Sequence, residues 1–214
     1  MFSASLMPPM PTGNELTAFL VVVCFAAGLN VYATVIVLGL LSHAQLLTLP
    51  TGLHLLENWY VLTACFVLYL VEFVGDKIPV FDLLWNAIQT FVRVPVAALL
   101  AYGATTHLPD WEQLLATLLG GLIALAAHGG KTALRATVAH SPEPFSNSAL
   151  SLGEDATVVF LLWYATRHPY VAAGIAVVAL LVIAVTIRAV VRAMRRLFRN
   201  TEGTLAKKTG DPSC

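Results

Sequence analysis

Two acidic residues inside an apolar stretch are the first feature of this chain that could do chemistry. Glu72 and Asp76 lie four residues apart in LYLVEFVGDK, residues 68–77. On a helix this spacing places both carboxylates on one face. Neighbouring carboxylates can share a proton or bind a hard cation. Because charge is costly in a bilayer, the pair is a candidate proton or cation site.

Arg93 is the second feature, and it lies about ten residues into another apolar segment, followed by Val94 and Pro95. An arginine at membrane depth requires a carboxylate partner or a water-filled cavity. We expect Arg93 to pair with one of the acids. The pair would belong either to a binding site or to a fixed structural contact.

The segment HGGKTALR, residues 128–135, contributes two more basic groups. Lys131 and Arg135 are four residues apart and share a helix face. They could bind an anion or pair with Glu154 and Asp155, which open a later apolar segment. Alternatively, they are positive residues of a cytoplasmic loop that set the membrane orientation.

Glu154 and Asp155 have an ordinary explanation and a functional one. Acidic residues in a first helical turn complement the helix dipole, which accounts for one of the two. Glu154 is the stronger functional candidate, as the counterpart of Glu72 in a second half of the chain.

Asn30 is the remaining polar candidate, near the centre of the apolar segment AAGLNVYATV. An asparagine in a bilayer needs hydrogen-bond partners, and the small residues around it permit close helix packing. Asn30 is expected either to stabilise helix packing or, with Tyr32, to line a translocation path.

The composition indicates that a bilayer surrounds these groups. Hydrophobic residues make up 58% of the chain and charged residues 11%, with a mean hydropathy of +0.79. Soluble domains carry about 25% charged residues. Six segments are long and apolar enough for spanning helices: Thr17–Leu41, Leu53–Gly75, Leu83–Ala104, Leu114–His128, Leu150–Thr166 and Tyr170–Val190.

The basic residues predict the orientation of these six helices. Arg167 is the one Lys or Arg in the first, third and fifth connections, residues 42–51, 105–113 and 167–169. The other two connections hold Lys77, Lys131 and Arg135, and the end of the chain holds seven more basic residues from Arg188 to Lys208. By the positive-inside rule, both termini are predicted to be cytoplasmic in an inner (plasma) membrane.

The order of the segments predicts an all-α fold with two inverted three-helix halves. An apolar helix with a polar centre precedes an acidic segment in each half, as in secondary transporters with inverted repeats. The predicted division has four parts: an N-terminal segment (1–15), a first half (16–104), a second half (105–191) and a basic, partly disordered tail (192–214).

Several classes of function lack their motifs in this sequence. No phosphate-binding glycine loop, HExxH, CxxC, GxSxG or EF-hand pattern occurs. The three cysteines form no disulfide or metal-binding pattern. We therefore expect no enzyme activity, no cofactor and no nucleic-acid partner. The expected partners are the bilayer, anionic lipid headgroups at the tail and a small solute or ion, and a homo-oligomer stays open.

Five segments in order resemble an uncharacterised bacterial membrane family catalogued as domain of unknown function 4126: GLNVYATVIVLGLL, LYLVEFVGDKIPVFDLLWNAIQTFVRVPVAALLA, AHGGKTALRA, SPEPFSNS and LGED. The resemblance covers most of residues 16–190 and implies an integral membrane protein without a specified activity. EFVGDK is also similar to the Glu-x-Gly-Asp signature of calcium/manganese cation–proton exchangers. It departs from that signature by an extra residue between Glu72 and Gly75 and by Ile78. That resemblance would make Glu72 and Asp76 cation ligands.

Three functions remain open, and secondary transport of a small solute or ion is favoured. In this interpretation Glu72 and Asp76 form the proton or cation site, with Glu154 as its counterpart. The alternatives are a non-transporting scaffold or assembly factor with fixed ion pairs, and a membrane protein acting on lipid-linked substrates through its basic groups.

Overall fold

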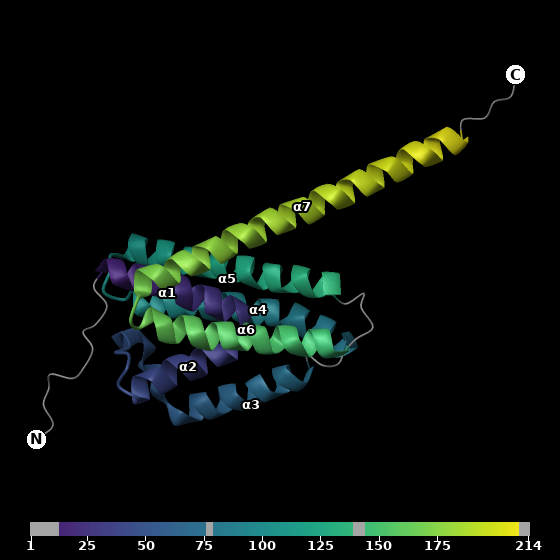
Figure 1. The fold of residues 1–214 in the computed structure, drawn as a ribbon. Helices are drawn as coiled ribbons and strands as arrows, with labels where there is room; N and C mark the ends of the chain where they lie inside the picture. Colours follow the sequence, from purple (N-terminus) through teal and green to yellow (C-terminus); the bar gives the residue numbers. More distant parts are fainter. Residues whose placement is uncertain (1–12, 76–78, 139–143, 210–214) are drawn as a thin grey trace, which may run out of the picture.

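The computed structural model describes residues 13–75, 79–138 and 144–209, and the regular structure in these ranges is helical (Figure 1). The elements are α1 (Gly13–Leu29), α2 (Val31–His43), the 3-10 helix η2 (Thr51–Glu57), α3 (Trp59–Gly75), α4 (Pro79–Ala104), α5 (Asp110–Val138), α6 (Pro144–Ala165) and α7 (Pro169–Thr209). The all-α class predicted from the sequence is confirmed in these ranges.

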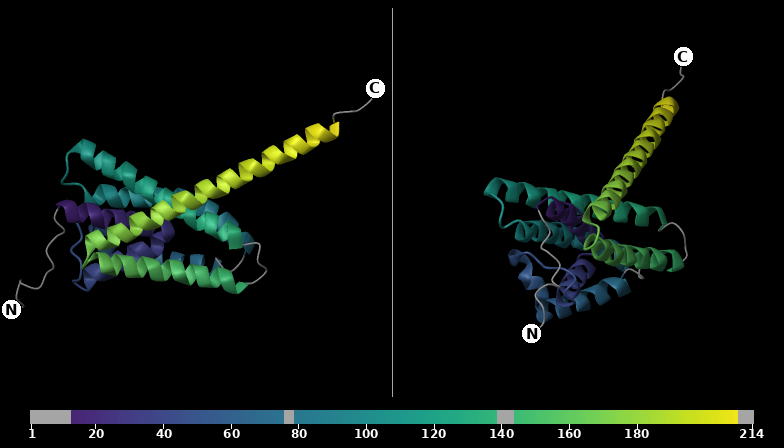
Figure 2. Two further views of the ribbon diagram at one scale, coloured as in Figure 1. Left: turned by 45° about the horizontal axis from the view of Figure 1, so that its top comes forward. Right: turned by 60° about the vertical axis from the view of Figure 1, so that its left-hand side comes forward.

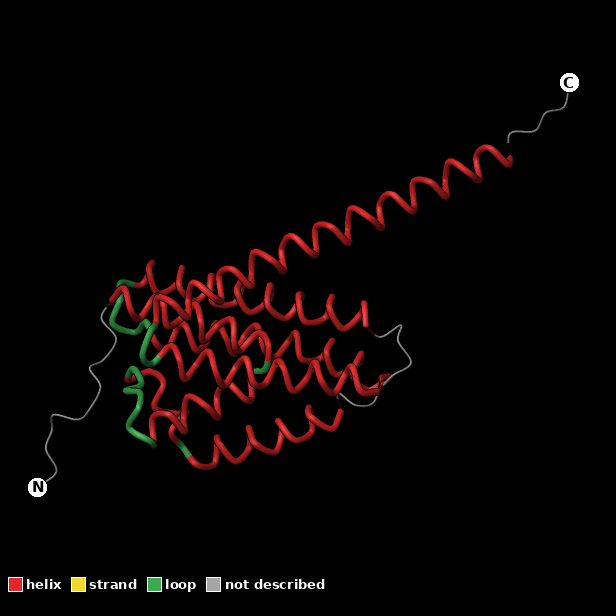
Figure 3. The backbone as a smooth tube through the Cα atoms, in the orientation of Figure 1, coloured by secondary structure: helices red, strands yellow, loops and turns green. Residues whose placement is uncertain are grey.

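The first apolar segment is a helical hairpin rather than the single span predicted over residues 17–41. Its turn is Asn30, whose backbone is extended at φ −149° and ψ 104°. The Asn30 side chain accepts a hydrogen bond from the Ala33 amide at 3.0 Å and caps α2. One turn inside the bundle, between α1 and α2, is visible in Figure 3. The apolar run concealed this break, because both arms are buried on most sides and show no change in hydropathy.

Contacts at the far ends of the two arms confirm the reversal. The start of α1, at Gly13, shares a pocket with Thr105, which follows the end of α4. The end of α2 lies beside the start of α3, because Ser42 donates a hydrogen bond of 2.6 Å to Glu57. Gly52 of η2 in turn packs against Gly103 of α4. Both arms therefore begin and end at the same end of the bundle.

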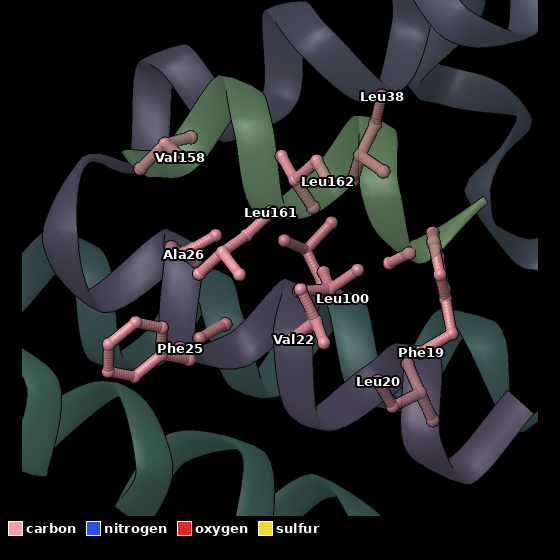
Figure 4. Packing of buried hydrophobic residues seen from close by; sticks show 14 of the residues in the cluster. Phe19, Leu20, Val22, Phe25, Ala26, Leu38, Leu100, Val158, Leu161 and Leu162 are labelled. Carbon is pink, nitrogen blue, oxygen red and sulfur yellow. The ribbon is translucent and has the colours of Figure 1, made fainter. Parts of the chain in front are cut away.

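The hairpin forms the centre of the hydrophobic core. Apolar side chains of α1 meet those of α6 at Leu161 and Leu162, while Leu38 contributes from α2 and Leu100 from α4 (Figure 4). Val22 and Ala26 of α1 are 0% exposed. A helix buried on all sides has no polar face, which is why α1 carries no amphipathic pattern.

The helices that surround the hairpin differ from their predicted bounds. α5 runs without interruption through Gly129 and Gly130, and a Cβ on Gly130 would approach Ile183 of α7 to 2.6 Å. The glycines therefore permit close packing and do not end the helix. α6 begins at Pro144, whereas the sequence predicted its start at Leu150.

α7 extends well beyond its apolar part. It is predicted to end near Val190 and instead continues to Thr209, projecting away from the bundle (Figures 1 and 2). Arg, Met, Leu, Lys and Ala are good helix formers, so the basic segment prolongs the helix up to residue 209. The partly disordered tail predicted from residue 192 is thus helical to that point.

Among the described residues, three helices are long and apolar enough to cross a membrane: Ala87–Ala104, Asp110–Leu134 and Pro169–Ala189. A fourth candidate is η2 with α3, bent by 64°. Large apolar side chains face outward on these helices, among them Phe91, which is 82% exposed. Such a surface is compatible with a membrane protein. The six predicted spans are not confirmed.

The inverted repeat is only partly reproduced. Along the chain, α3 and α6 run in opposite directions through the bundle, as do α4 and α7 (Figure 1). The first elements of the two halves differ. The α1–α2 hairpin starts and finishes at the same end of the bundle, whereas α5 crosses from one end of the bundle to the other. The start of α1 and the end of α7 consequently lie at opposite ends of the bundle (Figure 2).

Candidate functional site

The tip of the α1–α2 hairpin leaves backbone groups that a continuous helix would have paired. Leu29 and Gly28 end α1, and their carbonyls face two basic side chains. Lys131 Nζ of α5 donates a hydrogen bond to Leu29 O at 3.1 Å. Arg93 Nη1 of α4 lies 3.5 Å from Gly28 O. Positive groups at the carboxyl end of a helix also complement its dipole.

Glu72 of α3 connects these two cations. Its Oε1 accepts from Arg93 Nη2 in a short contact and lies 3.4 Å from Lys131 Nζ. The exposed fractions of the three side chains are 0% for Arg93 and 1% for Glu72 and Lys131. Ions buried to this degree are stable only when paired. Glu72 therefore holds α3, α4 and α5 together.

Lys131 extends the contact to α6. Its Nζ lies 2.8 Å from Glu154 Oε2, and Glu154 is 11% exposed. The three acceptors of the ammonium group, on Leu29, Glu72 and Glu154, match its three donors. Lys131 thus links the acid of the first half of the chain to that of the second.

Asp155 is the third carboxyl group, and it contacts neutral groups. Its Oδ1 accepts from Asn30 Nδ2 at 2.9 Å and its Oδ2 accepts from the Tyr69 hydroxyl at 2.8 Å. The Asn30 side chain thereby hydrogen-bonds both the Ala33 amide of α2 and the carboxylate of Asp155. Asp155 lies near the positive amino end of α2, while the cations face the carboxyl end of α1.

His128 joins the far side of Arg93. Its Nδ1 lies 3.0 Å from Arg93 Nη1, and its Nε2 lies 2.8 Å from Thr90 Oγ1. A guanidinium group can only donate, so Nδ1 must accept and the ring proton must be on Nε2. This assignment from the hydrogen bonds makes His128 neutral.

We call this set the buried charge cluster. Its members are Asn30, Tyr69, Glu72, Arg93, His128, Lys131, Glu154 and Asp155. They come from the hairpin tip and from α3, α4, α5 and α6. Six of the eight candidates that the sequence singled out are brought together here: Asn30, Glu72, Arg93, Lys131, Glu154 and Asp155.

The side chains of the remaining two candidates lie outside the described residues. Asp76 lies in the segment 76–78, and the side chain of Arg135 is outside the described residues although α5 includes its backbone. Their predicted roles stay predictions. Sequence reasoning missed Tyr69 and left His128 among scattered histidines. His128 is three residues before Lys131, a spacing that places both on one face of α5.

A second buried polar contact lies beside the cluster. Gln89 Nε2 of α4 donates to the Tyr32 hydroxyl of α2 at 3.2 Å. Gln89 is four residues before Arg93 and so shares its helix face.

Glu72 Oε2 and Arg93 Nε are both buried without a hydrogen-bond partner among the described residues. A small rotation would pair these two atoms and make the Arg93–Glu72 contact bidentate.

Glu72, Arg93 and Lys131 of the cluster are closed from solvent in this conformation, whereas Tyr69, Glu154 and Asp155 are partly exposed. One pocket of about 250 Å³ lies beside Ser42 and Glu57, and another of about 390 Å³ lies beside Cys24. Neither is lined by a member of the cluster. Within the described residues, no group of three His, Cys, Asp or Glu side chains is placed to bind a metal ion.

The hairpin tip makes a direct prediction. Asn30→Ala removes the cap of α2, worth about 0.5–2 kcal/mol, and a buried donor to Asp155, worth about 1–3 kcal/mol. The free energy of unfolding in mixed detergent micelles should fall by about 2–4 kcal/mol. Asn58→Ala is the control, because the Asn58 side chain is exposed and accepts a hydrogen bond from the Tyr60 amide at the start of α3. Equal losses in the two variants would contradict the bridging role of Asn30.

Comparison with known proteins places the chain in a family. It belongs to the family described as "Domain of unknown function (DUF4126)", whose profile matches residues 18–189. The matched region includes every member of the buried charge cluster. The comparisons with curated proteins and with solved structures found no significant match. They give no support to the resemblance to calcium/manganese cation–proton exchangers.

Proposed function

We propose that this member of a family without an assigned activity is a secondary transporter of a small solute or ion. The buried charge cluster would be its coupling site. The observation that carries the proposal is the convergence of charged side chains from α3, α4, α5 and α6 on the break between α1 and α2. Discontinuous helices whose ends face charged groups are typical of transporter binding sites.

The depth of two members of the cluster, Arg93 and Glu154, supports this function, whereas Glu72 lies in the last turn of α3. Arg93 is 104 − 93 = 11 residues from the end of α4, and Glu154 is 165 − 154 = 11 residues from the end of α6. At 1.5 Å per residue both lie roughly 16 Å from that end of the bundle. This is about half the roughly 30 Å thickness of the hydrocarbon core. Substrate sites of secondary transporters lie near this midplane.

The proposed topology has a re-entrant hairpin followed by five crossing helices, α3 to α7. The bundle end where α1 starts carries Arg167 in its connections, whereas the other end carries the basic extension of α7. By the positive-inside rule the second end is cytoplasmic, in an inner membrane. The N-terminus would then be on the opposite side. This replaces the expectation of two cytoplasmic termini.

The contacts suggest how such a site would work. Lys131 is shared between Glu72 and Glu154, so a proton or cation on one acid would release the ammonium group toward the other. Because Leu29 O also binds Lys131, this exchange would alter the contact with the hairpin tip. A ligand changes a conformational equilibrium only through such differential contacts.

A non-transporting scaffold is the second candidate, favoured by the near-complete burial of Arg93, Glu72 and Lys131. Fixed ion pairs would look the same in one conformation. The third sequence-based candidate, action on lipid-linked substrates, would be favoured by a lateral opening lined by Lys131 and Arg135, and the side chain of Arg135 lies outside the described residues. Lys131 instead points into the cluster, so no observation favours this function.

Ion flux in proteoliposomes tests the proposal. Under imposed pH and divalent-cation gradients we expect flux in the native protein and a loss of at least tenfold in Glu72→Gln and Glu154→Gln. Asp110→Asn is the control, because Asp110 is acidic but exposed at the start of α5. Circular dichroism and size-exclusion chromatography establish that all variants are folded. Unchanged flux in both folded cluster variants would refute the proposed site.

A further inference from the structure

The three carboxyl groups of the buried charge cluster are not equivalent. Glu72 contacts Arg93 and Lys131, and Glu154 contacts Lys131. Asp155 receives its two hydrogen bonds from Asn30 and Tyr69, which are neutral. We propose that Asp155 is the group on which the cluster binds and releases a proton, with the Tyr69 hydroxyl as its reorienting partner.

The charges of the described residues give a reason for proton binding. Glu72, Glu154 and Asp155 face two cations, Arg93 and Lys131, and the hydrogen bonds of His128 make it neutral. With all three acids ionised, Asp155 carries a negative charge that neither of these cations contacts directly in the described part of the chain. An uncompensated buried charge is costly, and a proton on one carboxylate removes it.

The hydrogen-bond geometry selects the oxygen that takes the proton. The Asn30 Oδ1 atom accepts from the Ala33 amide, which fixes the orientation of the amide group. Asn30 Nδ2 must therefore donate to Asp155 Oδ1, and this oxygen must remain an acceptor. A tyrosine hydroxyl, in contrast, can donate or accept. The proton accordingly binds Oδ2, and the Tyr69 hydroxyl rotates to accept from it.

This step is balanced without another reactant. Asp155 Oδ2 takes a proton from hydronium, which leaves water, and the Tyr69–Oδ2 hydrogen bond is retained with its direction reversed. No member of the contact has to leave the site. The ionised and protonated forms are therefore both hydrogen-bonded, which a reversible proton site requires.

The surroundings of Asp155 are consistent with access to protons. Asp155 and Tyr69 are only partly buried, whereas the Glu72 side chain is 1% exposed. The charged or titratable groups that act on Asp155 are Tyr69 and Glu72 from α3 and Lys131 from α5, with Asn30 contributing a neutral amide from the hairpin. The proton site is thus at the edge of the cluster.

The consequence for transport rests on the proposed function. Asp155 ties α6 to the hairpin tip through Asn30 and to α3 through Tyr69. Ionisation restores the negative charge of Asp155 and so favours a cationic partner in the cluster, while protonation removes that preference. Under this scheme the coupling ion is a proton, one per cycle.

Infrared difference spectroscopy tests proton binding without any transport assay. The purified protein in lipid nanodiscs would be titrated in pH while the carbonyl stretch of a protonated carboxylic acid is followed. We expect this band to appear as pH falls in the native protein and in the control Asp110→Asn, whose acid is exposed at the start of α5, and to be absent in Asp155→Asn. An asparagine amide can donate to Tyr69 and accept from Asn30, so it mimics the protonated acid and should fold.

Tyr69→Phe provides a second readout that a merely structural role would not give. Removing the Tyr69 donor takes a hydrogen bond from the ionised form, so the band should appear at a pH at least half a unit higher. Retention of the band in Asp155→Asn, or its loss in Asp110→Asn, would overturn the proposal. So would a native protein without the band. Flux in the absence of the band would retain the transporter and reject Asp155 as its proton site.

Discussion

Lys131→Met should lower the free energy of unfolding by about 3–5 kcal/mol, the range for removing one partner of a buried ion pair. Methionine has nearly the length and volume of lysine, so packing changes little. It removes the charge that compensates two acids and the donor to Leu29 O. Glu154 loses its 2.8 Å contact with the ammonium group.

The measurement is reversible unfolding in mixed detergent micelles, compared with Arg167→Met. Arg167 is also basic but is exposed at the connection between α6 and α7. Surface substitutions away from special features usually stay within about 0.5 kcal/mol. If Lys131→Met were as mild as the control, the cluster would not be stabilised by this cation.

A double-mutant cycle separates charge from shape. Adding Glu154→Gln to Lys131→Met removes the acid that lost its cation. The double variant should therefore recover part of the stability, with a coupling energy of about 1–3 kcal/mol. Strict additivity of the two losses would show that Lys131 and Glu154 act independently, against the 2.8 Å contact.

Residue chemistry anticipated much of the site. Arg93 was expected to pair with an acid, and it contacts Glu72. Pairing of Lys131 with Glu154 or Asp155 was one of three alternatives, and Lys131 lies 2.8 Å from Glu154. These expectations follow from the cost of unpaired charge in an apolar environment. Because unpaired charge is costly, each buried charged side chain must have a partner, whatever the arrangement of the helices.

The arrangement itself could not be read from hydropathy. Asn30 and Gly28 lie in an uninterrupted apolar run, and such a run suits one spanning helix as well as two short buried helices. Asn30 does carry a local signal, because asparagine is a strong N-cap residue and an amide acceptor three residues on completes the cap. The signal was outweighed by the length of the run. With the break unrecognised, residues 17–41 were predicted as one spanning helix, whereas they form the two arms of the α1–α2 hairpin.

The pairing of the charged side chains and the break in the first apolar segment are connected at the hairpin tip. Its broken helix supplies Leu29 O and Gly28 O to the cations and the Asn30 amide to Asp155. A continuous first helix would have used those carbonyls internally. The break is therefore what makes the charge cluster a polar site rather than a set of isolated ion pairs.

Gly28→Ala should disrupt this site through packing alone. A Cβ at Gly28 would lie 2.5 Å from Ala124 O and 2.7 Å from Ala127 Cβ, both on α5. Neither atom belongs to a flexible side chain, so α1 must move away from α5. Overpacking of this kind costs about 1–3 kcal/mol. The same movement shifts Gly28 O from Arg93 and the tip from Lys131, so flux should fall at least tenfold.

Gly174→Ala is the matched control for this prediction. Gly174 lies inside α7, and a Cβ there would meet nothing within 4 Å. Alanine is favoured over glycine in a helix by about 1 kcal/mol, and this gain applies equally to both sites because neither glycine has a positive φ. The difference in unfolding free energy between the two variants therefore isolates the contact of α1 with α5. Equal stability and flux in both would mean that the hairpin tip tolerates displacement, and its break could not then position the cluster.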